Sequence, residues 1–105
     1  MSIYNASLPF EVPVPGDLNP GETHTMWADA EIYYGWRSLW KVKIKKLTVK
    51  WNGQQVVTCI NVKKVSQGSI KAGEIKFDNI DSFSHALQIL VHAATAVYNA
   101  YKESL

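Results

Sequence analysis

The stretch LWKVKIKKLTVKWNGQQVVTCINVKKV, residues 39–65, decides the fold of this chain. It consists of two runs in which apolar and polar residues alternate, and Asn52-Gly53 stands between them. A two-residue type I′ turn needs a positive φ at both central residues, which asparagine and glycine tolerate best. The stretch therefore predicts a β-hairpin. Counting outward from its turn predicts the facing pairs Trp51–Gln54, Val49–Val56 and Leu47–Thr58.

The alternation of the first run breaks at Lys45-Lys46, because Ile44 is out of step with Leu47. One extra residue at this point, a β-bulge, restores a single apolar face along the hairpin. The bulge would bring Ile44 opposite Ile60, and Val42 opposite Val62. The other face is then predicted to carry Lys41, Lys43, Lys50, Lys63 and either Lys45 or Lys46, with Thr48, Val57, Cys59 and Asn61 between them.

The composition indicates one globular domain with a net charge of +2. The sequence contains no run of about 18 apolar residues, so no membrane span is predicted. The N-terminus has neither the charged region nor the apolar region of a signal peptide. The single cysteine, Cys59, cannot form an internal disulfide, which fits a reducing compartment. We therefore expect a cytoplasmic protein.

Residues 1–22 are predicted to form a proline-rich extended arm, followed by one sheet-plus-helix domain over residues 23–105. Within the arm, Pro9, Pro13 and Pro15 share one parity. Proline lacks an N–H group, and alternate N–H groups of an extended strand point to the same edge. The pattern predicts an edge strand that pairs on one side and is blocked on the other. A flexible polyproline-type tail is the alternative.

Two further segments have strand patterns. Residues 23–34 alternate between apolar and acidic side chains, which favours a strand, and a helical turn around residues 27–31 is the alternative. Residues 69–77 are predicted as another strand. Its apolar parity changes between Ala72 and Ile75, so Gly73 is expected to mark a second bulge.

A helix is predicted from about Ser82 to Glu103, with Asp81 or Ser82 as its N-cap. At 100° per residue, the face that should cover the sheet carries Phe83, Leu87, Leu90, Val91, Ala94, Val97, Tyr98 and Tyr101. The apolar arc continues over one flank made of Ile89, Ala93, Ala96 and Ala100. Because a surface helix needs an apolar arc of only about 100°, this flank predicts another contact. The N-terminal arm could supply it, but we favour a homodimer.

These elements predict an α+β fold, in which an antiparallel sheet of four to five strands has one long C-terminal helix packed on one face. The order of elements from Leu39 onward, with Val-Lys-Trp-Asn-Gly at residues 49–53, resembles the single-strand-binding domains of the positive-cofactor-four, Whirly and PUR-repeat types. The resemblance implies binding of single-stranded nucleic acid. However, Thr58-Cys-Ile-Asn-Val62 lacks the basic signature that those domains place on this strand.

The residues that could support catalysis or metal binding are few. No pattern places a histidine beside Cys59, so a thiol nucleophile is not predicted. His85 and His92 are two helical turns apart, roughly 10 Å, which is too far to share a metal ion. Asp29 and Glu31 share a strand face and could act as paired carboxylates, but a solvent-facing strand explains them equally well. We therefore predict no catalytic residue, metal or cofactor.

The most informative feature is a group of lysines on and beside the predicted hairpin: Lys41, Lys43, Lys45, Lys46, Lys50, Lys63 and Lys64. Such a group makes a local positive field that attracts an acidic partner. Our first hypothesis is a small intracellular, non-catalytic protein-binding module of the immunity, inhibitor or accessory kind, acting through this basic face and the aromatic N-terminal region. The second is a single-stranded nucleic-acid binder, because lysines with aromatic platforms hold such strands. An enzyme or small-ligand binder comes third.

Overall fold

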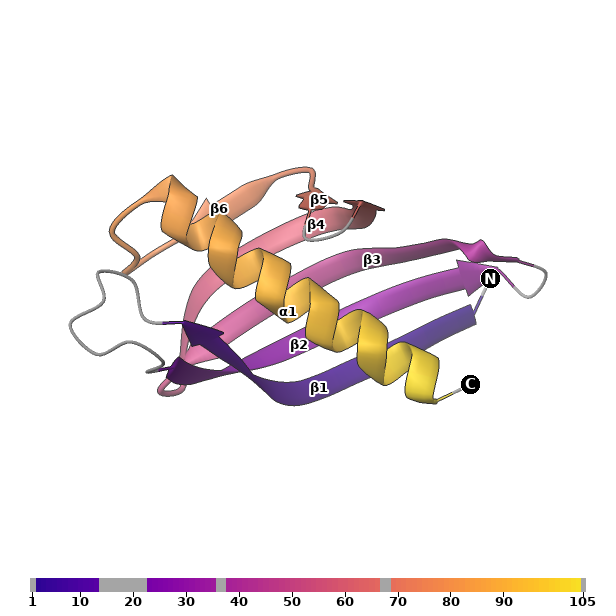
Figure 1. Cartoon of the computed structure of the whole chain (residues 1–105), viewed down its shortest axis with the longest axis horizontal. Helices are drawn as coiled ribbons and strands as arrows, with labels where there is room; N and C mark the ends of the chain where they lie inside the picture. Colours follow the sequence, from indigo (N-terminus) through magenta and orange to yellow (C-terminus); the bar gives the residue numbers. More distant parts are fainter. Residues whose placement is uncertain (1, 14–22, 36–37, 67–68, 105) are drawn as a thin grey trace.

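A computed structural model describes residues 2–13, 23–35, 38–66 and 69–104, without the side chains of residues 2, 35, 38–42, 64–66, 69 and 70. Six strands and one helix follow in the order β1 (Ser2–Pro13), β2 (Thr23–Gly35), β3 (Ser38–Trp51), β4 (Gln54–Ser66), β5 (Ser69–Lys71), β6 (Ile75–Phe77) and α1 (Phe83–Glu103). The strands form one antiparallel sheet in the spatial order β1-β2-β3-β4-β5, and β6 also pairs with β4. Helix α1 crosses one face of this sheet (Figure 1). The predicted α+β fold is confirmed.

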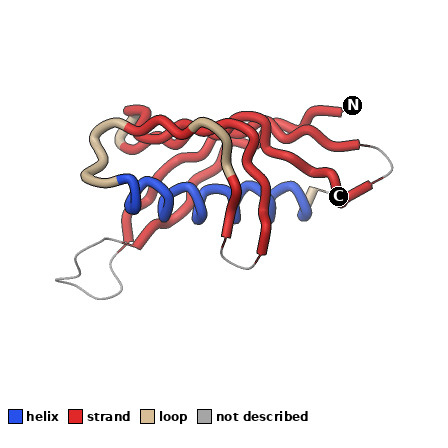
Figure 2. The backbone as a smooth tube through the Cα atoms, turned by 90° about the horizontal axis from the view of Figure 1, so that it is seen from above, coloured by secondary structure: helices blue, strands red, loops and turns tan. Residues whose placement is uncertain are grey.

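The sheet curves around the helix, and no described helix or strand covers its other face in the view from above (Figure 2). Between the two layers lies an entirely apolar core, with no buried polar or charged residue in the described part of the chain. Ile32, Ile44, Leu47, Ile89 and Leu90 are its largest fully buried side chains. Within the described residues, no helix has the length and apolar character needed to cross a membrane.

The turn of the central hairpin has the predicted conformation. Asn52 has a φ of 53° and Gly53 a φ of 78°, the two positive values that a type I′ turn requires. Trp51 lies opposite Gln54, as expected.

Beyond this first pair the predicted hairpin register is wrong. Val49 lies opposite Val57 instead of Val56, because the register shifts between Val49 and Lys50 and Val56 is an extra residue of β4. The later pairs shift with it. The structure pairs Leu47 with Cys59 and Ile44 with Val62, where the sequence predicted Leu47–Thr58, Ile44–Ile60 and Val42–Val62.

The bulge predicted at Lys45 exists, but it interrupts the pairing of β3 with β2 and not the pairing of β3 with β4. Glu31 lies opposite Lys46 and Ile32 opposite Ile44, so Lys45 has no partner in β2. This extra residue lets both Ile44 and Leu47 point into the core, where both are fully buried.

The side chains of β4 depart from strict alternation between the two faces of the sheet at two positions, which the sequence did not predict. The first change is the extra residue Val56, and the second lies at Asn61, whose φ of 55° is left-handed. Between them, Val57 and Cys59 point into the core, and Ile60 is 38% exposed on the other side. The expectation that Val57 and Cys59 share the lysine face, and that Ile60 faces the core, is therefore wrong.

Strand β1 is an edge strand, as predicted. It pairs with β2 over its whole length, and β2 is its only neighbour in the described sheet. Pro9 and Pro13 are tolerated because their missing donors point away from β2. Pro15 lies outside the described residues. The even-numbered side chains from Ala6 to Val12 face the helix, and Val12 is almost fully buried.

The segments before and after the hairpin also form strands. Residues 23–35 are a strand throughout, so the helical-turn alternative is wrong. The predicted strand over residues 69–77 is two short strands, β5 and β6, separated by residues 72–74. Both pair with β4 in one continuous register, so Gly73 marks an interruption and not the predicted bulge. Gly73 donates its N–H to the Ile60 carbonyl at 2.9 Å, and a Cβ there would lie 3.1 Å from that oxygen. Glycine permits this close approach.

Helix α1 begins as predicted. Ser82 is its N-cap, and the Ser82 hydroxyl accepts the His85 N–H at 3.1 Å. The buried face is rotated from the predicted one. Phe83 is 52% exposed, whereas Ile89 and Ala93 are fully buried against the sheet. Two of the four residues predicted for self-association are thus part of the core, and only Ala96 and Ala100 stay half-buried.

Candidate binding surface on the open face of the sheet

The open face is the face of the sheet turned away from α1. On β1 and β2 it carries the odd-numbered residues, because the even-numbered ones point into the core. Alternation and pairing then place six further strand positions of β3, β4 and β6 on this face: Lys46, Thr48, Lys50, Gln55, Thr58 and Lys76. The open face is therefore a mostly polar surface.

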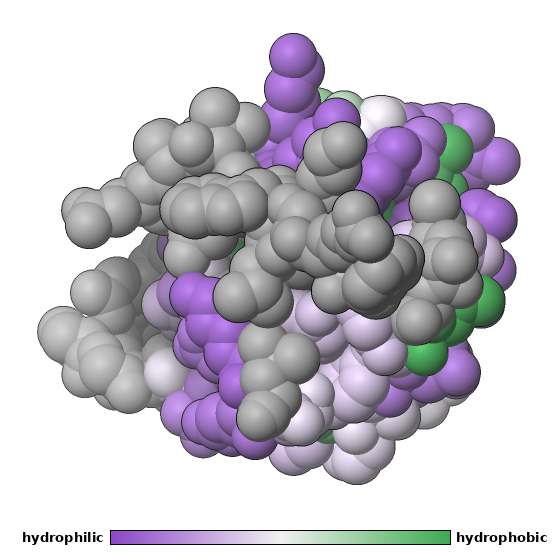
Figure 3. All heavy atoms as spheres, turned by 90° about the vertical axis from the view of Figure 1, so that its right-hand side faces the viewer, coloured by the Kyte–Doolittle hydropathy of each residue, from purple (hydrophilic) through white to green (hydrophobic). Residues whose placement is uncertain are grey.

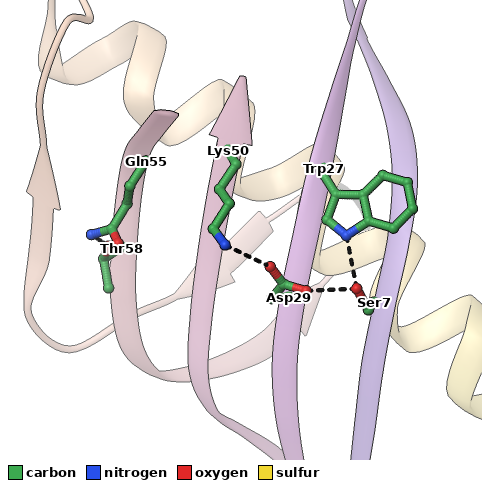
Figure 4. Close-up of polar contacts among 6 residues, drawn as sticks. All are labelled: Ser7, Trp27, Asp29, Lys50, Gln55 and Thr58. Atoms are coloured by element: carbon green, nitrogen blue, oxygen red, sulfur yellow. Dashed lines mark hydrogen bonds and ion pairs between the residues drawn. The ribbon is translucent and has the colours of Figure 1, made fainter. Parts of the chain in front are cut away.

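A chain of hydrogen bonds crosses the open face around Asp29 (Figure 4). The Trp27 indole N–H donates to the Ser7 hydroxyl at 2.7 Å, and that hydroxyl donates to an Asp29 carboxylate oxygen at 2.6 Å. The ammonium of Lys50 lies 3.6 Å from the other carboxylate oxygen. Strands β1, β2 and β3 each supply part of this chain, which therefore depends on their register.

Trp27 is the largest exposed side chain of this network. Its residue is 44% exposed, although its one polar group is already bonded to Ser7. The hydrogen bond to Ser7 restricts the orientation of the indole, and its ring is left open to solvent. Nearby on β4, the Gln55 side-chain amide donates to the Thr58 hydroxyl at 2.6 Å, which fixes a second part of the same face (Figure 4).

The lysines predicted to bind a partner separate into groups. Lys46, Lys50 and Lys63 are exposed and Lys43 is half-buried, while the side chains of Lys41 and Lys64 lie outside the described residues. The Lys45 ammonium donates to the Tyr33 hydroxyl at 3.1 Å and lies 4.7 Å from the centre of that ring. The hydrogen bond to Tyr33 raises the pKa of Lys45, so this lysine stays charged.

Acidic side chains interrupt the positive charge. Asp29 and Glu31 lie on β2 beside Lys50 and Lys46 of β3, so the open face is a row of lysines bordered by carboxylates. An exposed ion pair such as Asp29–Lys50 contributes little to stability, about 0–1 kcal/mol. The Asp29 carboxylate thus contacts Lys50 through one oxygen and Ser7 through the other.

The candidate catalytic groups are not assembled into a site. Burial raises the pKa of the Cys59 thiol to about 12, so the thiol is neutral and enclosed. His24 stacks on Trp51 with 4.7 Å between ring centres, and His85 contacts Asp81 at 2.9 Å. The described residues contain no group of three or more side chains that could hold a metal ion.

Sequence reasoning did not identify Ser7 or Tyr33 as parts of this surface, and it considered Trp27 only as one of several aromatic platforms near the lysines. For Trp27 and Tyr33 the sequence did contain a signal. Both are odd-numbered residues of the same strand as Asp29 and Glu31, so all four side chains should share one face. Ser7 becomes visible only through the pairing of β1 with β2, which places it opposite Asp29.

No family model, curated protein or solved structure matches this chain.

Proposed function

We propose that this chain is a non-catalytic protein-binding module of the immunity, inhibitor or accessory kind, and that its open face contacts the partner. The observation that carries the proposal is the exposed ring of Trp27, whose N–H is already bonded to Ser7. Tryptophan is strongly enriched among the few interface residues that dominate binding energy. A ring whose orientation is set before binding loses less conformational entropy when the partner covers it.

The charges beside Trp27 support an acidic partner. Lys46 and Lys50 are exposed on β3, and Lys50 lies opposite Trp27 in the sheet. Positive side chains around an aromatic anchor raise the association rate for a negatively charged surface and help to set its orientation. The single buried thiol, Cys59, supports placing the protein in the cytoplasm. The proposal requires no cofactor.

Single-stranded nucleic acid is the second candidate, because Trp27 and Tyr33 lie on the same face as the lysines of β3. Such strands stack on aromatic rings and neutralise their phosphates on lysines. The carboxylates of Asp29 and Glu31 weigh against it, since the regularly spaced phosphates of a strand lying across the face would meet them. A folded acidic protein can place its carboxylates on the lysines alone. The open face is therefore better suited to a protein partner than to single-stranded nucleic acid.

The test compares variants on the two sides of the molecule. A partner recovered from the native host with the wild-type chain is purified, and its affinity is measured by calorimetry. Trp27→Ala should weaken binding roughly 10- to 1,000-fold, as expected for a dominant interface residue. Gln88→Ala changes an exposed residue of α1 and should leave the affinity unchanged.

Two outcomes would contradict the proposal. In the first, Gln88→Ala weakens binding and Trp27→Ala does not, which moves the interface to the helix. In the second, an oligonucleotide binds at low salt, its affinity falls steeply with added salt, and Trp27→Ala abolishes binding. That result would establish the second candidate instead.

A further inference from the structure

The outer edge of β1 carries backbone donors that the sheet does not use. Pro9 pairs opposite Trp27 and has no N–H, so the even-numbered residues of β1 bond to β2 and the odd-numbered ones point outward. No hydrogen bond within the described part of the chain uses the N–H of Ile3, Asn5 or Ser7. An unpaired edge of this kind is a template for another strand.

Prolines protect only half of this edge. In its C-terminal half, Pro9 and Pro13 remove two of the three outward donors and leave only that of Glu11, whereas residues 3–7 contain no proline. Ile3, at the unprotected end, is 54% exposed. The blocked half prevents extended pairing, and the unblocked half is long enough for one short, specific pairing.

We propose that residues 3–7 of β1 pair antiparallel with the same residues of a second copy of this chain. The register follows from the fact that only the odd-numbered residues of β1 direct their backbone N–H and C=O groups outward. Centring the pair on Asn5 sets Asn5 opposite Asn5 and Ile3 opposite Ser7, so every pair joins residues whose N–H and C=O both point outward. Shifting the register by two residues toward the C-terminus would bring Pro9 opposite Ile3 and remove a donor.

Charge also suits this edge to a second copy. Residues 3–8 carry no charged side chain, whereas the open face of β3 carries several lysines. Two identical surfaces can meet only where they do not repel each other, because like charges placed directly opposite are destabilising. Figure 3 faces the end of the molecule where β1 begins and α1 ends, and it shows a pale area of intermediate hydropathy and green apolar atoms among the hydrophilic ones.

The helix supplies a second layer to the same interface. The Tyr98 hydroxyl donates to the Val62 carbonyl of β4, so the opposite flank of α1, with Ala96 and Ala100, faces the β1 side. The rings of Tyr101 and Tyr4 lie 5.6 Å apart, which places the C-terminal half of α1 beside the unblocked edge (Figure 1). A two-fold axis through Asn5, perpendicular to the sheet, brings two such flanks together. Their small side chains permit close approach.

The experiment measures the association state of the full chain by sedimentation velocity over a wide concentration range. The wild type should form dimers. Asn5→Pro removes the central outward donor from both copies, and it should raise the dissociation constant roughly 10- to 100-fold. Glu11→Pro is the matched control, because it removes an outward donor on the same edge outside the paired residues, and it should leave the dimer intact.

A second variant keeps the test decisive if Asn5→Pro does not fold. Residues opposite each other in a hydrogen-bonded antiparallel pair have Cα atoms about 5.5 Å apart, which a disulfide can span. Asn5→Cys should therefore form a covalent dimer under mild oxidation, and Glu11→Cys should not. The native Cys59 does not compete, because it is buried. A wild type that stays monomeric at all concentrations, or equal cross-linking of both cysteine variants, would overturn the proposal.

Discussion

Single residues decide which way each strand faces. Lys45, Val56 and Asn61 each change the alternation of their strand, and together they determine which side chains of the hairpin enter the core. A bulge changes the face of every residue beyond it until the next bulge reverses the change. Ile44 and Ile60 show the result, since Ile44 is fully buried and Ile60 is 38% exposed.

This difference predicts unequal costs for two chemically identical substitutions. Ile44→Ala should lower the free energy of unfolding by about 2–5 kcal/mol, because it leaves a cavity in the core. Ile60→Ala should cost much less, because its side chain is already partly in water. Urea denaturation of both variants checks this. Equal losses would mean that Ile60 also points into the core, as the uninterrupted alternation had implied.

At the scale of the element, α1 depends on its first turn and on its buried stripe. The Ser82 hydroxyl satisfies one of the N–H groups that a helix start leaves unpaired, and the backbone N–H of Ala86 bonds to the Ser82 carbonyl. No acidic residue lies in the first turn, so the cap at Ser82 is not supplemented by a first-turn carboxylate that would interact with the helix dipole.

Removing this cap should destabilise the protein measurably. Ser82→Ala should lower the free energy of unfolding by about 0.5–2 kcal/mol, because the His85 N–H loses its acceptor. Ser84→Ala is the control, since Ser84 is exposed within the helix and alanine is the better helix former. Thermal unfolding followed by circular dichroism measures both. A larger loss for Ser84→Ala would show that the cap does not stabilise this helix.

At the scale of the whole molecule, β1 and α1 need each other. Phe10 and Val12 of β1 are buried beneath the helix layer, and the Tyr101 ring of α1 packs on Tyr4 and Tyr34. The part of the apolar surface of α1 that packs on β1 would lie open to water if β1 were absent.

Deleting residues 1–13 should therefore abolish cooperative folding. The loss of the edge strand removes one of the two partners of β2 and takes Phe10 and Val12 out of the core. Burial of apolar side chains of this size contributes roughly 1.5–3 kcal/mol each. Calorimetry of the shortened chain checks this. A cooperative transition near the wild-type temperature would instead show that the N-terminal segment is a dispensable arm.

Much of the fold could be predicted because its signals are local. Asn52-Gly53 sets the hairpin turn, Ser82 starts the helix, and the shared parity of Pro9 and Pro13 identifies an edge strand. The surface around Asp29 could not be predicted in the same way. It requires Ser7 and Lys50 to lie on either side of β2, and they are far from Asp29 in the sequence.

By itself, the sequence determined the α+β class, the turn, the helix start and the proline-blocked edge, since each depends on the conformational preferences of a few adjacent residues. Only the tertiary structure decided which β4 residues enter the core and which face of α1 meets the sheet. The physical reason is that the side chains of β4 change face at Val56 and Asn61, and these changes appear only once β4 is paired with β3 and packed on the helix. A bulge costs little locally, and the burial of Val57, Cys59 and Val62 together decides where it forms.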